Sequence, residues 1–309
     1  MTYVVIDTDT GIDDFFAIAQ ALRSPELRVE TLTTVGGNVP LRYATRNALR
    51  ALEYAGRPDI AVAQGSARPL RGAFQYAFYF HGPGGLPARL PRPAIGPVQE
   101  QAIDLLFRRA TDIGARRAPC TLIALGPATN AARLLRRLRT TGGRHRLEHV
   151  VVMGGAVDVP GNVTPFAEFN TWNDPESAAE VLDGDIPVTL VPLDVCAPVR
   201  IASGDFEQAH PTARRLGLAW LRRHPGRRLG LADCVAIAAA THPAAFGFEQ
   251  LAIDVDTSSG PERGRTRRGS RSERRIRVAM RVDADRVLDL IRTRALAPVP
   301  GAGGARGKR

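Results

Sequence analysis

Lysine, cysteine and long apolar runs are scarce or absent in this sequence of 309 residues. Lys308 is the only lysine, so a catalytic lysine within a folded domain has no candidate. The three cysteines, Cys120, Cys196 and Cys234, lack Cys-x-x-Cys spacing, which argues against a disulfide framework and favours reduced thiols. No run of 18 apolar residues occurs, so we expect no transmembrane helix and no membrane partner.

A secretory signal is also missing, because the first residues lack a basic segment, an apolar stretch and a small-residue cleavage site. Together with reduced thiols, this predicts a cytoplasmic protein. The hydrophobic content of 44% is enough for a large core, in one large domain or two smaller ones.

Charge of one sign dominates, with a net charge of +11 and a pI near 10.7. The excess lies in the arginine-rich segment 263–277 and in the C-terminal tail. A basic balance invites a nucleic-acid hypothesis, but the segment lacks RNP aromatics, zinc-finger spacing and a basic heptad region. A solvated arginine surface explains it better, and no nucleic-acid partner is expected.

Apolar, β-rich runs alternate with helical patterns along the chain. The runs that predict strands are 3–6, 28–37, 59–65, 120–126, 149–155, 187–194, 250–257 and 274–283, and those that predict helices are 13–24, 43–56, 97–112, 129–138, 174–183, 231–243 and 284–296. This alternation predicts an α/β fold with an open, mostly parallel sheet and helices on both faces.

The pattern predicts one domain, 1–296, because no linker divides the chain. Strands 250–257 and 274–283 are expected to pair around an arginine- and glycine-rich hairpin. The tail, 297–309, has too little apolar surface to order itself, so we expect it to be disordered. Several predicted strands end in polar or glycine-rich loops. In a parallel sheet such loops converge on one pocket.

Four carboxylates, Asp7, Asp9, Asp13 and Asp14, follow the first predicted strand. Helix capping accounts for Asp13 and Asp14 but not for the other two. Crowded carboxylates repel one another unless a cation or proton offsets them. Oxygen ligands without a nearby histidine or cysteine indicate a hard cation, Ca²⁺ or Mg²⁺.

Two familiar acidic loops do not fit. An EF-hand needs a preceding helix and a glutamate at its twelfth position, where this chain has Ile18. Aspartyl phosphatases of the haloacid dehalogenase type generally carry threonine or valine where this chain has Gly11, and they need a catalytic lysine.

The stretch DTDTGIDD (7–14) resembles the N-terminal signature of the inosine-uridine-preferring nucleoside hydrolases. The resemblance continues in family order through TTVGGN (33–38), HGPGGL (81–86), ALGPATN (124–130), MGGAVDVPGNVTPFAEFN (153–170), ADCVA (232–236) and ERGRTRRG (262–269). Each motif is short, and the ordered set carries the resemblance. It implies a Rossmann-like sheet and the hydrolysis of purine or pyrimidine ribonucleosides to ribose and free base.

The resemblance also implies residue roles. One Ca²⁺ would be held by Asp9, Asp14, Asp233 and the backbone carbonyl of Leu125, and Asp9 would be the general base. Asp7 would support the loop. The ribose 2′- and 3′-hydroxyls would be bound by Asp13, Asn38, Asn170 and Asp233, and the 5′-hydroxyl by Asn162 and Glu168.

His81, expected in a loop, is a candidate catalytic residue facing the pocket.

The resemblance further leads us to expect a role in nucleoside salvage. We also expect the protein to form a homodimer or a homotetramer.

One position departs from the family pattern. Members that hydrolyse inosine and uridine generally carry histidine just before the aspartate matched by Asp233, and it helps to protonate the leaving base. Here that position is Ala232. A Ca²⁺-dependent ribose- or nucleoside-binding protein without turnover is the alternative, although binding alone would not need the base candidate Asp9.

Overall fold

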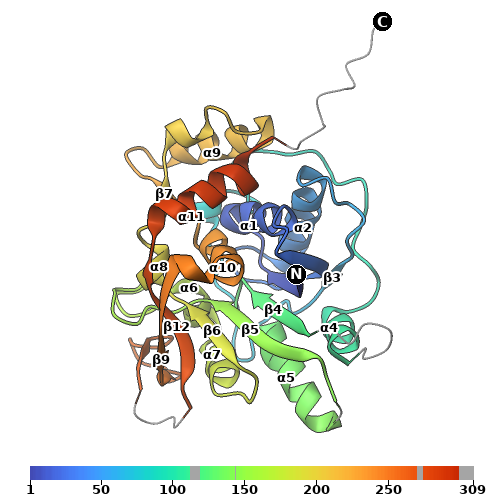
Figure 1. Cartoon of the computed structure of the whole chain (residues 1–309), viewed down its shortest axis with the longest axis vertical. Coiled ribbons are helices and arrows are strands. Elements are labelled where there is room, and N and C mark those ends of the chain that lie inside the picture. The colour runs from blue at the N-terminus through green and yellow to red at the C-terminus, as the bar shows by residue number, and fades with distance from the viewer. Residues whose placement is uncertain (112–118, 143, 270–273, 299–309) are drawn as a thin grey trace, which may run out of the picture.

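The computed structural model describes residues 1–111, 119–142, 144–269 and 274–298. An eight-stranded sheet forms its centre, in the order β3-β2-β1-β4-β5-β6-β12-β9 (Figure 1). All neighbouring strands run parallel except β12 and β9. The strands are β1 Thr2–Thr8, β2 Leu27–Thr34, β3 Val62–Gln64, β4 Cys120–Ala124, β5 Leu147–Met153, β6 Val188–Val191, β9 Phe246–Leu251 and β12 Ile276–Val282.

Helices cover both faces of the sheet, as the alternating pattern predicts (Figure 1). One face carries α1 Ile12–Leu22, α2 Leu41–Tyr54, α9 Pro211–Arg223, α10 Ala232–Thr241 and α11 Ala284–Leu290, and the other carries α4 Ala102–Thr111, α5 Thr129–Thr141 and α7 Pro175–Leu182. In β1, Val4 and Ile6 pack in the first layer and Val5 in the second, because side chains alternate along a strand. The predicted α/β class with a single domain is confirmed.

Short elements connect the larger ones at the edges of the sheet. They include α3 Phe78–His81, α6 Phe169–Asn173, α8 Leu193–Cys196, η1 Ser203–Phe206, η2 Pro243–Ala245 and two small ribbons, β7 Arg200–Ile201 with β8 Leu229–Gly230 and β10 Ile253–Val255 with β11 Thr266–Arg268.

The predicted pairing of 250–257 with 274–283 is partly wrong. Strand β9 pairs antiparallel with β12, but β10 turns away to pair with β11. Two successive strands in one apolar run, separated only by Ala252, cannot be distinguished by periodicity.

The C-terminal segment packs against the first helix. After α11 the chain continues in a π-helical segment, η3 Ile291–Leu296. The Tyr54 hydroxyl donates to the carbonyl of Ala295 at 2.7 Å, and Arg23 donates to the carbonyl of Ala297 at 2.8 Å. Arg294 forms an ion pair with Glu26 at 2.7 Å. The end of the folded chain is therefore bonded to the turn after α1 and to the end of α2.

The domain boundary near 296 stays a prediction, and residues 299–309 of the expected tail lie outside the described residues. Within the described part, no helix is long and apolar enough to cross a membrane.

Candidate active site

A hollow of about 530 Å³ opens where the loops after β1, β2, β4 and β5 meet. The order of the sheet changes direction at β1, and ligands bind at such points in open α/β sheets. Its lining includes most of the residues that the sequence singles out: Asp13, Asn38, His81, Leu125, Asn162, Glu168, Asn170, Ala232 and Asp233.

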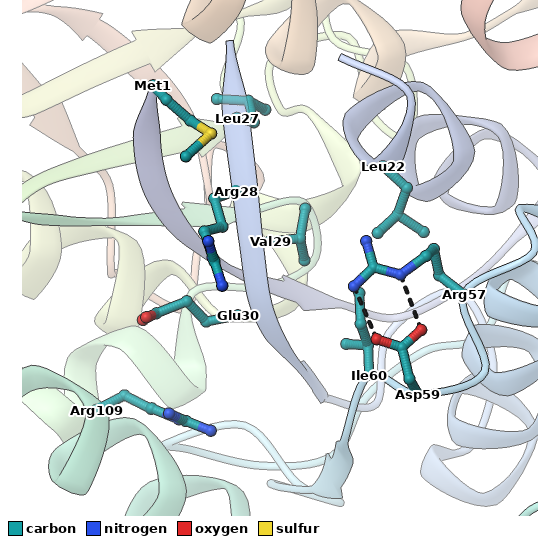
Figure 2. Close-up of a pocket in the computed structure, with 10 residues that line it drawn as sticks. All are labelled: Met1, Leu22, Leu27, Arg28, Val29, Glu30, Arg57, Asp59, Ile60 and Arg109. Carbon is teal, nitrogen blue, oxygen red and sulfur yellow. Dashed lines mark hydrogen bonds and ion pairs between the residues drawn. The ribbon is translucent and has the colours of Figure 1, made fainter. Parts of the chain in front are cut away.

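A second hollow, of about 450 Å³, lies at the opposite ends of β1 and β2. Figure 2 shows Arg28 and Arg109 on one side of β2 and Arg57 on the other, so the three guanidinium groups do not converge. Arg57 is neutralised by an ion pair with Asp59 at 2.8 Å. This hollow has no concentration of catalytic groups.

Asn38 joins two of the buried carboxylates at the floor of the site. Its side-chain amide donates to Asp9 Oδ1 and to Asp14 Oδ2, both at 3.1 Å, and its backbone N–H donates to Asp9 Oδ2 at 2.6 Å. Thr8 and the backbone of Gly11 donate to the two oxygens of Asp14 at 2.6 and 2.8 Å. Asn38, expected as a sugar ligand, therefore also holds the acidic loop in place.

Asp13 and Asp14, near the start of the chain, lie close to Asp233, which comes much later in the sequence. The three residues offer carboxylate oxygens that lie within 4.8 Å of one another. Asp13 and Asp14 lie in the first turn of α1, and Asp233 lies in the first turn of α10. Asp13, expected to bind sugar, thus belongs to the same carboxylate cluster as the expected metal ligands Asp14 and Asp233.

Burial and mutual repulsion make these carboxylates costly without a cation. Burial, reinforced by the charge of Asp14, raises the pKa of Asp13 to about 8 and holds the pKa of Asp9 well above its ordinary value. The pKa of Asp233 is raised by burial and by the charges of Asp13 and Asp14. A hard cation would offset this repulsion.

The donor set fits such a cation. Asp13 Oδ1 is buried and has no hydrogen-bond partner, which leaves it available to a ligand. Every side chain of the cluster offers oxygen, the donor that Ca²⁺ and Mg²⁺ take.

Asp7 supports the floor from below. Its Oδ1 accepts hydrogen bonds from Thr33 at 2.6 Å and from Asn130 at 2.8 Å. Burial raises its pKa to about 7 despite these two donors. Asn130 also bonds to the carbonyl of Thr34 and to the N–H of Ser66, so it joins the ends of β1 and β2 to the loop after β3. Its place in the ALGPATN motif was visible in the sequence, but its role was not.

The position immediately before Asn38 requires glycine, and Gly37 occupies it. A Cβ atom built on Gly37 would lie 2.1 Å from Asp9 Oδ2. Only a residue without a side chain lets the backbone approach the carboxylate this closely.

His81 is the last residue of the short helix α3, so its expected place in a loop is wrong. Its Nδ1 accepts a hydrogen bond from the N–H of Ile12 at 3.2 Å and lies 3.8 Å from Asp13 Oδ1. Burial lowers the pKa of His81 to about 4. A neutral ring whose Nδ1 accepts carries its proton on Nε2.

The expected sugar ligands on the opposite wall are held by the backbone. Glu168 caps α6 and accepts hydrogen bonds from the N–H groups of Gly155, Asn170 and Thr171 at 2.9 to 3.1 Å. Asn170 donates to the carbonyl of Leu125 at 2.7 Å, which is one of the expected metal ligands.

Asn162 Oδ1 accepts from the N–H of Phe169 at 2.9 Å. These contacts pre-organise the wall, and the assigned ligand roles stay predictions.

The arginine-rich segment, 263–277, is hydrogen-bonded to the loop after β5. Thr266 in β11 exchanges two hydrogen bonds with the backbone of Ala156, in the loop after β5. Its arginines form ion pairs: Arg263 with Glu176, Arg265 with Glu262, and Arg268 with Asp158 and Glu249. Arg271 lies outside the described residues.

Residues 4–289 match the family model described as inosine-uridine preferring nucleoside hydrolase. The chain belongs to this family. The predicted resemblance is confirmed, and the protein is a nucleoside hydrolase.

Individual relatives agree with this assignment. The hydrolase is 38% identical to uridine nucleosidase 1 of Arabidopsis thaliana over 66% of its own chain and 60% of that relative. The solved structure of a plant nucleoside hydrolase, PpNRh1, superposes with a TM-score of 0.87 at 31% identity and covers 96% of this chain and 99% of that one. A purine-preferring ribonucleoside hydrolase from Gardnerella vaginalis gives 0.86 at 27% identity, over 95% and 98% of the two chains.

Other residues around the hollow of the hydrolase carried no sequence signal. Phe80, Cys196, Arg200 and Arg227 line it together with Ala232. They come from short segments whose course no periodicity predicts.

Proposed function

We propose that this protein hydrolyses the N-glycosidic bond of ribonucleosides with the help of one bound Ca²⁺, giving ribose and free base. The observation that carries the proposal is the convergence of Asp13, Asp14 and Asp233, of which Asp13 and Asp233 line a hollow large enough for a nucleoside and Asp14 is buried beside them. Asp9, joined to Asp14 through Asn38, completes the acidic floor.

The residues divide the chemistry between them. Asp9, Asp14, Asp233 and the carbonyl of Leu125 would hold the cation, which would position and acidify a water molecule. Asp9 would accept a proton from that water, because its carboxylate lies on the acidic floor and is held there by the side chain and backbone of Asn38. Breaking the C1′–N bond builds positive charge on the ribose, and the surrounding carboxylates and amides stabilise it.

Incubation of the purified protein with a panel of ribonucleosides tests the proposal, with released ribose as the measurement. Purine and pyrimidine nucleosides both belong in the panel. Calorimetric binding of nucleosides without release of ribose from any of them would favour the non-catalytic binding protein instead.

Ca²⁺ is expected to raise the melting temperature of metal-free protein. Binding that offsets the buried carboxylates stabilises the folded state by about 2.7 kcal/mol at a hundredfold excess over Kd. For a chain of 309 residues, that is a rise of roughly 4 °C. Differential scanning fluorimetry after treatment with EDTA measures it, with NaCl of equal ionic strength as the control. An unchanged melting temperature at saturating Ca²⁺ would contradict the metal assignment.

Nucleosides without the 2′-hydroxyl are expected to be poor substrates. Asp13 and Asn170 would lose a partner in the pocket, and buried polar groups left unpaired lower the rate by at least about 10²-fold. Steady-state kcat/KM for inosine and 2′-deoxyinosine measures this ratio. Equal values would remove the sugar-binding roles of both residues.

Compartment and assembly remain separate proposals. A cytoplasmic enzyme of nucleoside salvage and a homodimer or homotetramer are expected. Cell fractionation and light scattering on the purified protein test them.

A further inference from the structure

The hollow carries two arginines, and alanine occupies the position where the family pattern expects a proton-donating histidine. Arg200, Arg227 and Ala232 all line the hollow. Strand β7 pairs with β8 so that Arg200 stands opposite Gly230, two residues before Ala232. Arg200 is therefore paired close to the position where the family pattern expects the histidine that protonates the leaving base, and Arg227 lines the same hollow.

The guanidinium group of Arg200 is held but not neutralised. Its Nε donates to the carbonyl of Ala197 at 2.8 Å, which leaves the two terminal nitrogens for other partners. One of them, Nη1, lies 4.0 Å from a Cβ built on Gly230, so the group rests against a backbone without a side chain. Within the described residues, neither Arg200 nor Arg227 pairs with a carboxylate.

The other titratable groups of the hollow are poorly suited to deliver a proton to the base. His81 stands beside the acidic floor, where its Nδ1 accepts the N–H of Ile12 at 3.2 Å and lies 3.8 Å from Asp13 Oδ1. Burial raises the pKa of the Cys196 thiol well above its ordinary value. Tyr79 also lines the hollow, but its side chain is 67% exposed. A phenol this exposed is a candidate acid that a variant can test.

Building on the proposed hydrolysis, we propose that Arg200 and Arg227 receive the leaving base as an anion, so that the enzyme favours ribonucleosides whose base spreads negative charge over carbonyl oxygens. Guanidinium stays protonated and cannot act as the acid. Its planar fork binds a carboxylate bidentately, and the N–C–O edge of a deprotonated oxo-pyrimidine has a similar shape.

The reaction balances without an acid. The water oxygen bonds to C1′ while the C1′–N bond breaks, and the bonding electron pair stays on the base nitrogen. One proton of the water passes to Asp9, and the other remains on the new ribose hydroxyl. The base anion leaves the arginines and takes a proton from solvent, and Asp9 returns its own proton to solvent.

The test compares substrates of similar shape whose bases differ in acidity. Arg200→Gln and Arg227→Gln are each expected to lower kcat for uridine by about 10- to 100-fold, since each removes charge-assisted donors from the developing anion. The more acidic 5-fluorouridine should lose less, and p-nitrophenyl riboside should change by less than about threefold, because nitrophenolate leaves without help. Arg200→Lys, which keeps the charge but loses the fork, should fall between Arg200→Gln and the unaltered enzyme.

Two control variants show whether the effect belongs to the arginines of the hollow. Arg215→Gln removes an exposed arginine of α9 outside the hollow and should change no rate. Tyr79→Phe instead tests the rival acid: the arginine mechanism predicts a smaller loss of kcat for uridine in this variant than in either Arg→Gln variant. Loss of uridine hydrolysis in Tyr79→Phe with full activity in both Arg→Gln variants would overturn the proposal, and so would equal losses on uridine and p-nitrophenyl riboside.

Binding of free bases gives a second measurement that does not depend on turnover. Calorimetry on the Ca²⁺-loaded protein should find 5-fluorouracil bound more tightly than thymine, with the preference lost in Arg200→Gln. If Arg200→Gln still bound 5-fluorouracil more tightly than thymine by the same factor as the unaltered protein, the proposal would also be overturned. Failure of the unaltered protein to cleave any ribonucleoside or p-nitrophenyl riboside would instead refute the proposed hydrolysis, and the calorimetric preference would still decide the role of the arginines.

Discussion

Replacing Asp14 with alanine is expected to abolish Ca²⁺ binding and to lower nucleoside hydrolysis by at least about 10³-fold, because the cation supplies several kcal/mol to the transition state. Asp14 lies at the centre of the acidic floor. It shares the Asn38 donor with Asp9 and lies within 4.8 Å of Asp13 and Asp233. Calorimetry with Ca²⁺ and the rate of ribose release measure the two effects.

A second variant distinguishes loss of the metal from loss of folding. Asp14→Asn keeps the shape of the side chain and removes its charge from a repulsive, buried cluster. Its metal-free melting temperature should therefore equal or exceed that of the unaltered protein, while its response to Ca²⁺ should vanish. Asp104→Ala, which removes an exposed aspartate paired with Arg137, should behave like the unaltered protein. Full Ca²⁺ binding and activity in Asp14→Asn would refute the metal assignment.

p-Nitrophenyl riboside is expected to be cleaved at least about 10²-fold faster than inosine. Position 232 carries no acid, and general acid catalysis is typically worth about 10²–10⁴-fold for a leaving group that needs a proton. Nitrophenolate does not need one. Ala232 lines the hollow next to Asp233, so a longer side chain at position 232 is expected to enter the hollow. Ala232→His should accordingly speed inosine hydrolysis by about tenfold or more and barely change the activated substrate.

A size control completes this test. Ala232→Leu fills a similar volume without an acid and should not speed inosine hydrolysis. Equal rates on inosine and p-nitrophenyl riboside in the unaltered enzyme would show that another group already protonates the leaving base. The prediction based on Ala232 would then be wrong.

The sequence predicted the fold because apolar, β-rich runs alternate with helical patterns over most of the sheet. The sequence also placed Asp13, Asn38 and Asp233 at one site, although they lie far apart in the chain. The reason is that each lies in a motif of the same family, whose members share one site. Local pattern was less informative where elements are short. Helix α3 has four residues, too few for helical periodicity, so His81 was placed in a loop.

The roles of polar side chains were harder to predict than their positions. Glu168 holds three backbone N–H groups, and Asn38 holds two carboxylates, which only the folded geometry reveals. Arg200 and Arg227 gave no signal because the β7–β8 ribbon that aligns Arg200 with Gly230 has two residues in each strand. Contacts across such a ribbon depend on tertiary packing rather than on sequence period.

The attachment of the C-terminal segment to α1 has a consequence for synthesis of the chain. Residues 294–297 bond to Arg23, Glu26 and Tyr54, beside the helix that carries Asp13 and Asp14. A ribosome adding roughly 5–20 residues per second needs on the order of 15–60 s to reach that segment. Throughout this interval the nascent chain carries its acidic loop without the closing contacts of α1, and until Asp233 emerges it lacks a carboxylate of the floor. The packing of α1 is therefore completed only by the last folded residues of the chain.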